Sequence, residues 1–303
     1  MGVLMRVFRI GDYEIMGDDF WLCAEVGNNH QGKVDLCCTL IDRAKKAGAH
    51  AVKLQKRDID TFWSPEQLSM PYDNPNSFGK TYGEHKKVLE FDEQEWRKVV
   101  NYAKKADILL FSTAFDVKSV DFLENFDLPA YKVASACHTD YELMQRLVDT
   151  KKPLVISVGG GTWEQLDELY DFLKSNNAHF CFLHCVLEYP APAHHINMRV
   201  IQQMRTRYPD TIIGYSDHYT YSSGKSVMSW LAYALGARVF ERHFTLNASW
   251  PGPDHRLSAE PEEFEAMKHG FERMKVALGT GFKQVYAEEL PNIKKMQKWR
   301  PNV

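Results

Sequence analysis

Lys53 and Lys132 each lie inside a short apolar segment, where charged side chains are uncommon. A buried ammonium group is costly unless an anion pairs with it. The two lysines therefore indicate either a bound anionic ligand or internal pairing with carboxylates such as Glu25 and Glu241. Neutral hydroxyls, which typically complete a phosphate or carboxylate site, end other apolar segments. These hydroxyls belong to Ser112, Thr113, Ser135, Ser157 and Ser216.

His218 and His243 form a second pair of interest, because each ends an apolar segment of its own. Two imidazoles at neighbouring strand ends can share a divalent metal ion, with a carboxylate or waters as further ligands. Buried histidines that are only hydrogen-bonded are the alternative. The residue types alone thus indicate an anion site and leave the metal site open.

Eight such apolar segments alternate with amphipathic helical patterns. Each segment is too short for a helix, and most are rich in β-branched or aromatic residues, so we expect strands. This alternation predicts parallel strands joined by helical crossovers, and eight units close a (β/α)8 TIM barrel. An open doubly wound sheet is the alternative, but no GxGxxG follows the first strand. The expected strands lie within residues 22–27, 51–56, 108–115, 130–135, 154–159, 179–185, 211–218 and 238–244.

Capping patterns predict where several of the intervening helices begin. Asp92 with Glu95, and Thr162 with Gln165, are each spaced as a capping box. Pro261 suits the first turn of the last long helix.

Two stretches lie outside the repeating units. Residues 7–16 alternate around Gly11-Asp12 and predict a β-hairpin that closes the bottom of the barrel. Residues 57–91 are far longer than an ordinary βα loop, and such loops are usually functional lids or disordered. We therefore divide the chain into a hairpin cap (1–20), a barrel domain (21–282) and a C-terminal tail (283–303).

Charge and composition exclude several classes of protein. Lys and Arg total 37 and Asp and Glu 40, a near-balance that argues against binding to nucleic acid or anionic membranes. No uncharged run reaches the ~18 residues that a membrane helix needs. None of the six cysteines forms a CxxC pair, and most lie in apolar stretches, so we expect a reduced, cytoplasmic protein.

The active site of a TIM barrel lies at the C-terminal ends of its strands, and there the sequence shows a set of collinear motifs. Together these motifs cover the chain from about residue 21 to 281, and their order is specific. They are AEVGNNHQG (24–32), VKLQ (52–55), FSTAFD (111–116), PAYKVAS (129–135), PLVIS (153–157), LHC (183–185), YPAP (189–192), IIGYSDH (212–218), ERHFT (241–245) and PGPDHRLSAEP (251–261). In them the chain resembles the sialic acid (N-acetylneuraminate) synthase family.

The resemblance implies an enzyme that condenses phosphoenolpyruvate with an open-chain acylamino sugar. The products would be a nonulosonic acid and phosphate, released by C–O cleavage. A divalent metal ion, manganese or magnesium, would be held by His218 and His243 and would activate the sugar aldehyde. Catalytic roles would fall to Glu25, Lys53, Lys132 and His243, with Glu25 as a candidate proton carrier. Phosphoenolpyruvate would contact Lys53, Thr113, Lys132, Ser135, Ser157 and Ser216. The sugar would contact Glu25, Gln55, Tyr189 and Asp254.

Three features depart from the family pattern. Cys137 stands where the family usually has an acidic residue that works near the metal and water. Cys137 could be a metal ligand or a packing residue. The role of the acidic residue could instead fall to Glu188 or Asp217. Leu187 replaces an asparagine that often contacts phosphoenolpyruvate. The sequence ends at Val303, before the antifreeze-like domain that members commonly carry.

Other functions stay open beside the synthase. A sister class uses phosphorylated aldoses, which require an additional basic pocket for which Lys56, Arg57 and Arg256 are candidates. A non-catalytic barrel that binds a ligand or partner is a third alternative. In the long loop of residues 57–91, the segments 72–74 and 82–85 could contact the sugar or a partner. Alternatively, the loop is a structural excursion that is packed by Trp63 and the tyrosines of the loop. We expect small-molecule substrates and allow for a homodimer.

Overall fold

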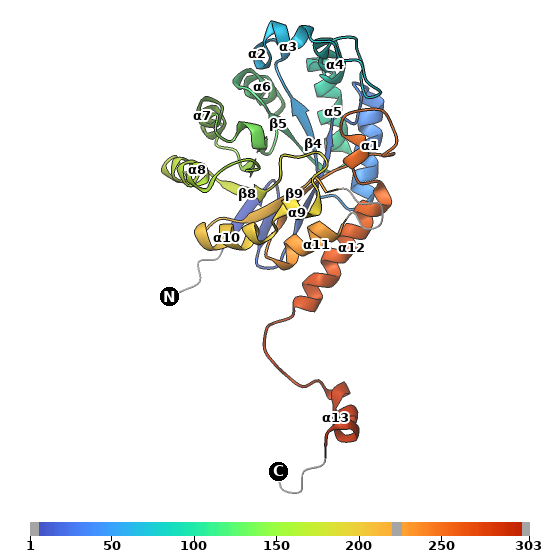
Figure 1. The fold of residues 1–303 in the computed structure, drawn as a ribbon, viewed down its shortest axis with the longest axis vertical. Coiled ribbons are helices and arrows are strands. Elements are labelled where there is room, and N and C mark those ends of the chain that lie inside the picture. The colour runs from blue at the N-terminus through green and yellow to red at the C-terminus, as the bar shows by residue number, and fades with distance from the viewer. Residues whose placement is uncertain (1–5, 220–225, 299–303) are drawn as a thin grey trace.

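The computed structural model describes residues 6–219 and 226–298. Eight parallel strands close into a barrel in the order β10-β3-β4-β5-β6-β7-β8-β9, with helices around it (Figure 1). This arrangement confirms the predicted (β/α)8 TIM barrel. The barrel strands are β3 (Trp21–Gly27), β4 (Ala51–Lys56), β5 (Leu109–Ala114), β6 (Tyr131–Val133), β7 (Leu154–Ser157), β8 (Phe180–His184), β9 (Ile213–Asp217) and β10 (Val239–His243).

The helices that connect the strands begin where the capping patterns predict. The backbone N–H of Glu95 donates to the Asp92 carboxylate at 2.9 Å, and the N–H of Gln165 donates to the Thr162 hydroxyl at 3.3 Å. Pro261 is the first residue of its helix. The helices around the barrel are α1 (Val34–Lys46), α5 (Glu93–Lys105), α6 (Val117–Leu123), α7 (Tyr141–Asp149), α8 (Trp163–Ser175), α9 (Ala193–Ile196), α10 (Arg199–Arg207), α11 (Val227–Ala234) and α12 (Pro261–Leu278). Short 3-10 helices are Glu124–Phe126, Ser135–Cys137, His255–Leu257 and Ala287–Glu289.

The predicted N-terminal hairpin is present as β1 (Val7–Ile10) and β2 (Tyr13–Met16), paired antiparallel. Its side chains Phe8, Ile10 and Ile15 are buried and belong to one apolar cluster with the barrel interior. The hairpin therefore closes the end of the barrel at which the strands begin. The barrel residues of this cluster are Trp21, Cys23, Ala51, Phe111, Ala130, Val155, Cys181, Leu183, Ile212 and Val239.

Inward-facing side chains change from apolar to polar along several of the barrel strands. Side chains of a strand alternate between its two faces, so every second residue points into the barrel. In β3, Trp21 and Cys23 belong to the apolar cluster, and Glu25 lies two residues further on. In β10, Val239 belongs to the cluster, and Glu241 follows it. In these strands the polar half is thus the C-terminal half, whereas the inward-facing residues of β8, Cys181 and Leu183, both belong to the apolar cluster.

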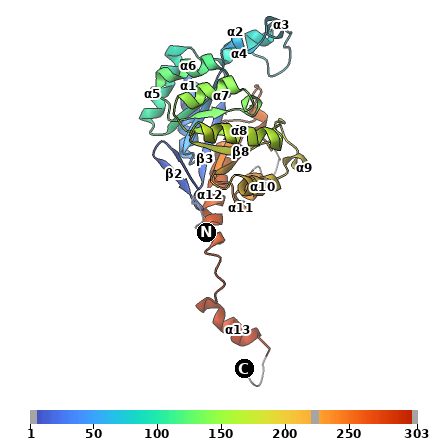
Figure 2. The ribbon, with the colours of Figure 1, turned by 90° about the vertical axis from the view of Figure 1, so that its left-hand side faces the viewer.

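The excursion between β4 and α5 contains three short helices rather than an irregular loop. These are α2 (Ile59–Phe62), α3 (Pro65–Ser69) and α4 (Tyr82–Leu89). Aromatic rings hold the excursion together: Trp63 and Tyr72 each lie 5.4 Å from Tyr82, and Tyr72 lies 4.6 Å from His85. The excursion projects from the barrel on the side opposite α13 (Figure 2).

The C-terminal tail leaves the barrel after α12. Its helix α13 (Leu290–Met296) stands apart from the barrel in both views (Figures 1 and 2). Apolar side chains of the tail such as Val285 and Met296 are exposed. Across the described part of the chain, none of the helices combines the length and apolar character needed to cross a bilayer.

Candidate active site

A cavity of about 370 Å³ opens at the C-terminal ends of the barrel strands. Every residue to which the resemblance gives a role contributes to its wall, so the structure brings these residues together. Ser112, which the sequence also indicated, is buried outside the wall, and its hydroxyl donates to the Leu54 carbonyl at 3.3 Å. Their roles stay predictions. The predicted residues in the wall are Glu25, Lys53, Gln55, Thr113, Lys132, Ser135, Ser157, Tyr189, Ser216, His218, His243 and Asp254.

Lys53 lies at the centre of a buried charge network. Its ammonium nitrogen is 2.8 Å from Glu25 Oε1, 3.6 Å from Glu241 Oε2 and 2.8 Å from the Thr113 hydroxyl. Lys132 lies on the other side of Glu241, with 3.9 Å between its Nζ and Glu241 Oε1. Both lysines therefore pair with carboxylates of the protein, which was one of the two explanations expected for charged side chains in apolar segments.

The two carboxylates of this network differ in their affinity for a proton. Burial disfavours the ionised form of Glu241, but Lys132 and Lys53 outweigh it and hold the pKa at about 2. Burial, together with the charge of Glu241, raises the pKa of Glu25 to about 7 despite the Lys53 contact. Glu241 is thus a fixed anion, and Glu25 can exchange a proton near neutral pH.

The internal pairing leaves this end of the cavity short of negative charge. Two lysines share one fully ionised carboxylate, Glu241, and a second carboxylate, Glu25, that ionises only near neutral pH. Burial lowers the pKa of Lys132, and a further anion beside its ammonium would favour the charged form. The pairing is therefore compatible with an anionic ligand.

Hydroxyl groups line the same cavity wall as Lys132. The Ser216 hydroxyl donates to Glu241 Oε1 at 3.0 Å, and the Ser135 hydroxyl accepts from the Gly159 N–H at 3.0 Å. The buried Ser157 hydroxyl has no hydrogen-bond partner among the described residues. A buried unsatisfied hydroxyl is costly, and its position in the cavity wall indicates a group that a ligand satisfies.

Gln55 links Glu25 to the rim of the cavity. Its amide nitrogen donates to Glu25 Oε1 at 2.7 Å, and its amide oxygen accepts from Arg57 at 2.7 Å. Gly27 makes this contact possible at an irregularity of the β3–β4 register, where its φ is +51°. A Cβ at this position would lie 3.0 Å from Gln55 Nε2 and 3.1 Å from Glu25 Oε1, so a side chain would disturb both groups.

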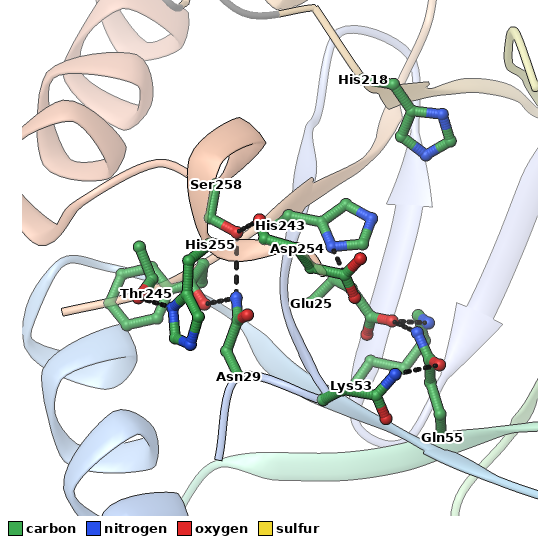
Figure 3. A network of polar contacts seen from close by, with 12 residues as sticks. Glu25, Asn29, Lys53, Gln55, His218, His243, Thr245, Asp254, His255 and Ser258 are labelled. Carbon is green, nitrogen blue, oxygen red and sulfur yellow. Dashed lines mark hydrogen bonds and ion pairs between the residues drawn. The ribbon is translucent and has the colours of Figure 1, made fainter. Parts of the chain in front are cut away.

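His218 and His243 face the cavity with 5.5 Å between ring centroids. His218 Nδ1 lies 2.8 Å from the Val186 carbonyl, so in the neutral ring Nδ1 carries the proton and Nε2, 4.0 Å from the Cys185 sulfur, has a lone pair for a further ligand. His243 Nδ1 is buried without a hydrogen-bond partner in the described structure, 3.9 Å from Asp254 Oδ2 (Figure 3). Burial and the neighbouring His218 keep the pKa of His243 well below its usual value, so this imidazole is neutral.

These two imidazoles supply only part of a metal shell. Within residues 6–219 and 226–298, no group of three or more His, Cys, Asp and Glu side chains is arranged to hold a metal ion. The two free ring nitrogens fit a divalent ion whose remaining ligands are substrate oxygens and waters. The unpartnered, neutral His243 is the observation that supports this fit.

Cys185 is a cavity residue for which the sequence motif LHC indicated no role. Its sulfur lies 3.6 Å from His218 Nδ1. Burial disfavours the thiolate, but His218 and hydrogen bonds lower the pKa of Cys185 below its usual value.

A second network braces the segment that carries Asp254 (Figure 3). The buried Asn29 amide donates at 2.9 Å to both the Phe244 carbonyl and the Ser258 hydroxyl. Ser258 in turn donates to the Asp254 carbonyl at 2.6 Å. Asn29 and Ser258 are positioning residues that sequence reasoning missed, although both lie inside the quoted motifs.

Cys137, Asp217 and Glu188, the candidates for the place or the role of the family's acidic residue, lie outside the cavity wall. Cys137 packs in the apolar core, where burial raises its pKa to about 11 and its sulfur contacts the Phe115 carbonyl. Asp217 forms an ion pair with Arg242 at 3.2 Å, and the Glu188 carboxylate contacts His195 at 2.8 Å. Cys137 is thus a packing residue, and Leu187 alone of the departing positions lines the cavity.

The long excursion contributes two cations to the cavity wall, Arg57 and Lys86. Arg57 was one of three candidates for an additional basic pocket, and Lys86 was missed. Lys56 instead pairs with Glu90 at 3.1 Å, and Arg256 is exposed outside the wall. Residues 72–74 and 82–85 also lie outside the wall, and of these Tyr72, Tyr82 and His85 pack against one another within the excursion.

Comparison with known proteins gives concordant results. The model of the NeuB family matches residues 40–283. The human N-acetylneuraminate-9-phosphate synthase is 35% identical over 278 residues, which cover 92% of this chain and 76% of the relative. The N,N'-diacetyllegionaminic acid synthase of Campylobacter jejuni is 31% identical, covering 91% of this chain and 83% of the relative. The solved structure of an N-acetylneuraminic acid (sialic acid) synthetase from Leptospira borgpetersenii, in complex with citrate, superposes with a TM-score of 0.82 at 28% identity, covering 97% of this chain and 98% of that one.

Proposed function

Because this chain belongs to the NeuB family, a family of phosphoenolpyruvate-condensing transferases, we propose that it joins phosphoenolpyruvate to an open-chain acylamino sugar. The products are a nonulosonic acid and inorganic phosphate. One observation carries the proposal: all of the residues to which the resemblance gives a role converge on a single cavity at the C-terminal ends of the strands.

The lysine end of the cavity is the proposed phosphoenolpyruvate site. Lys53 and Lys132 provide counter-charges for the phosphate and carboxylate, and preorganised charges of this kind stabilise a transition state without reorganisation. Their shortage of fixed negative charge and the unpartnered Ser157 hydroxyl support this assignment. The neutral donors are Thr113, Ser135, Ser157 and Ser216.

The acceptor sugar is proposed to lie against Glu25, Gln55, Tyr189 and Asp254. Glu25 Oε2 is buried and has no hydrogen-bond partner among the described residues, whereas its Oε1 is held by Lys53 and Gln55. The free oxygen can therefore exchange a proton with the sugar's carbonyl oxygen. Tyr189 packs on the His218 ring at 4.1 Å and forms part of the same wall.

His218 and His243 are the proposed ligands of a divalent metal ion, manganese or magnesium. When bound, such an ion would supply Lewis-acid polarisation of the sugar aldehyde. The chain's own residues account for the other requirements. The two lysines and the serine hydroxyls fix phosphoenolpyruvate, and Gln55 orients Glu25.

The reaction follows from these positions. C3 of phosphoenolpyruvate forms a bond to the aldehyde carbon, and the aldehyde oxygen takes a proton, which Glu25 can provide. Water adds at C2 and loses a proton. The C2–O bond to phosphate then breaks, and the C2 hydroxyl gives its proton to the departing phosphate, which leaves beside Lys53 and Lys132. C2 becomes a ketone. All of the phosphate oxygens, including the bridging one, therefore leave with phosphorus.

Phosphoenolpyruvate labelled with ¹⁸O at the bridging position tests this proposal. The protein is incubated with the labelled compound, Mn²⁺ and N-acetylmannosamine or its 6-phosphate, and phosphate is followed by ³¹P NMR. We expect sugar-dependent phosphate release with the label retained in phosphate. Release of unlabelled phosphate would contradict C–O cleavage, and no release with any acylamino sugar or free aldose would contradict the proposed activity. A homodimer and a cytoplasmic location stay predictions.

A further inference from the structure

We propose that Arg57 and Lys86 form a second anion subsite at the mouth of the cavity, which binds a phosphate at the end of the acceptor sugar remote from its aldehyde. The inference rests on the proposed condensation and specifies its acceptor. Both residues belong to the excursion between β4 and α5, at its beginning and near its end. The excursion thus brings two cations to one cavity wall.

Arg57 is held in a fixed orientation. Its guanidinium carbon lies 3.6 Å from the centroid of the Phe115 ring, and its NH2 donates to Gln55 Oε1 at 2.7 Å. Its guanidinium makes one carboxylate contact, in which NH1 lies 4.0 Å from Glu90 Oε1. A guanidinium has five N–H donors in a rigid fork, so most of them remain for a ligand. A preorganised fork of this kind matches the oxygens of a phosphate.

Lys86 has no carboxylate within ion-pairing distance in the described part of the chain. Its ammonium lies near two aromatic rings instead, 5.1 Å from that of Tyr82 and 5.5 Å from that of Trp63. Burial and the neighbouring charge of Arg57 lower the pKa of Lys86 to about 8. A half-buried ammonium without a close anion is a cost that a bound anion would relieve.

The charge balance distinguishes this pair from the lysines at the cavity floor. Lys53 and Lys132 have Glu241 between them, with Glu25 as a further partner. Arg57 contacts Glu90, which also pairs with Lys56 at 3.1 Å. The other carboxylate that acts on both Arg57 and Lys86 is Asp254, and burial raises its pKa. A phosphate monoester carries about −1.5 to −2 charges at pH 7, which two cations can balance.

The position of the pair assigns it to the acceptor rather than to phosphoenolpyruvate. The side-chain amide of Gln55 contacts both Glu25 and Arg57. Arg57 is therefore separated from the proposed proton carrier, Glu25, by a single side chain. An open-chain sugar with its aldehyde beside Glu25 can extend along Gln55 to this pair. Phosphoenolpyruvate, with three carbons, is accounted for by the lysines and serine hydroxyls on the other side of Glu25.

Steady-state kinetics with N-acetylmannosamine 6-phosphate and N-acetylmannosamine test the subsite. For the unmodified protein we expect kcat/KM to be about 10- to 100-fold higher with the phosphorylated sugar, the range that a charge-assisted contact provides. Lys86→Met should reduce this preference by a similar factor, through KM of the phosphorylated sugar. Lys86→Arg should restore most of it. Lys87→Met, an exposed lysine of the same helix outside the cavity wall, should leave both rates and the preference unchanged.

Each other outcome has a distinct meaning. Equal use of both sugars by the unmodified protein would overturn the subsite and leave the proposed condensation intact. Turnover of neither sugar would overturn the condensation itself. A Lys86→Met variant with normal thermal unfolding whose preference is unchanged, or whose defect is in KM of phosphoenolpyruvate alone, would also overturn the subsite.

Discussion

The two halves of the barrel interior are built on the same strands and are equally buried, yet they differ in chemistry. In the lower half, Trp21 is 1% exposed within an apolar cluster; in the upper half, Glu25 and Lys53 are 1% and 2% exposed. Burial alone therefore does not decide which residues occupy the interior. The upper half keeps its charges because they are paired, and paired buried charges contribute little net stability. The lower half stabilises the fold, and the upper half is arranged for chemistry.

The hairpin sharpens this difference. Phe8, Ile10 and Ile15 close the lower end, so water reaches the interior from the upper end, where the cavity opens. The charges of Lys53 and Glu241 therefore lie above an apolar floor. An apolar floor strengthens their interaction, since electrostatic interactions are stronger where water is excluded.

The largest effect is expected for Glu241→Gln in the upper half. The substitution leaves Lys53 and Lys132 with one fewer fixed anion. Removing one partner of a buried ion pair costs about 3–5 kcal/mol in the free energy of unfolding, and loss of the ordered charge should lower kcat/KM by about 100-fold or more. Urea unfolding and the phosphate-release assay measure the two effects. Glu188→Gln, at a half-buried carboxylate outside the cavity wall, is the control and should change neither; equal behaviour of the two variants would contradict the account.

Trp21→Ala tests the lower half. Deleting a fully buried aromatic side chain should lower the free energy of unfolding by about 3–5 kcal/mol. KM of phosphoenolpyruvate should stay unchanged in the folded fraction, because Trp21 lies in the apolar cluster below the cavity. Trp21→Phe keeps most of the packing and should cost much less. A large rise in KM with little loss of stability would remove the distinction between the halves.

Ser157→Ala separates binding from stability in the upper half. The hydroxyl has no partner in the described structure, so its loss should change the free energy of unfolding by no more than about 0.5 kcal/mol. KM of phosphoenolpyruvate should rise about tenfold, since the ligand loses one hydrogen bond to a charged group. An unchanged KM would exclude Ser157 from the phosphoenolpyruvate site.

A pH-dependent loss of stability is expected at the buried His30, which follows the C-terminal end of β3. His30 packs on Phe91 at 4.1 Å, and burial lowers its pKa to about 3. Below pH ~6.5 the unfolded chain binds a proton there that the folded chain does not, so stability is lost as pH falls from 6.5 towards 3. One such proton contributes roughly 1.4 kcal/mol per pH unit to the free energy of unfolding. Urea unfolding at pH 7.5, 6 and 5 should show a shallower loss for His30→Gln; identical slopes would contradict the assignment.

Much of this arrangement could be predicted from the sequence because it follows from local rules. Strand–helix alternation predicts the barrel, and the ends of parallel strands must meet at one edge, which brings Lys53, Lys132 and His243 together. The carboxylate with which each buried lysine pairs could not be predicted in the same way. Whether Lys132 meets Glu25 or Glu241 depends on register and side-chain conformation across the barrel.

The contacts that the segments between strands and helices make with the cavity or the core also could not be predicted from the sequence. Lys86 reaches the cavity only because the excursion packs α4 back against the barrel mouth, which depends on contacts such as that between Trp63 and Tyr82. Cys137 follows β6 closely, yet its short 3-10 helix turns it into the core rather than into the cavity. In both cases the direction of a side chain depends on tertiary packing that no local pattern encodes.

A crystal structure of the protein with Mn²⁺ and phosphoenolpyruvate tests most directly whether the upper half of the barrel interior is the catalytic half. We expect the phosphate and carboxylate beside Lys53 and Lys132, within hydrogen-bonding distance of Ser157. We also expect an anomalous manganese peak between His218 and His243. Phosphoenolpyruvate bound at Arg57 and Lys86 instead, or density for neither ligand in the cavity at saturating concentrations, would contradict this assignment.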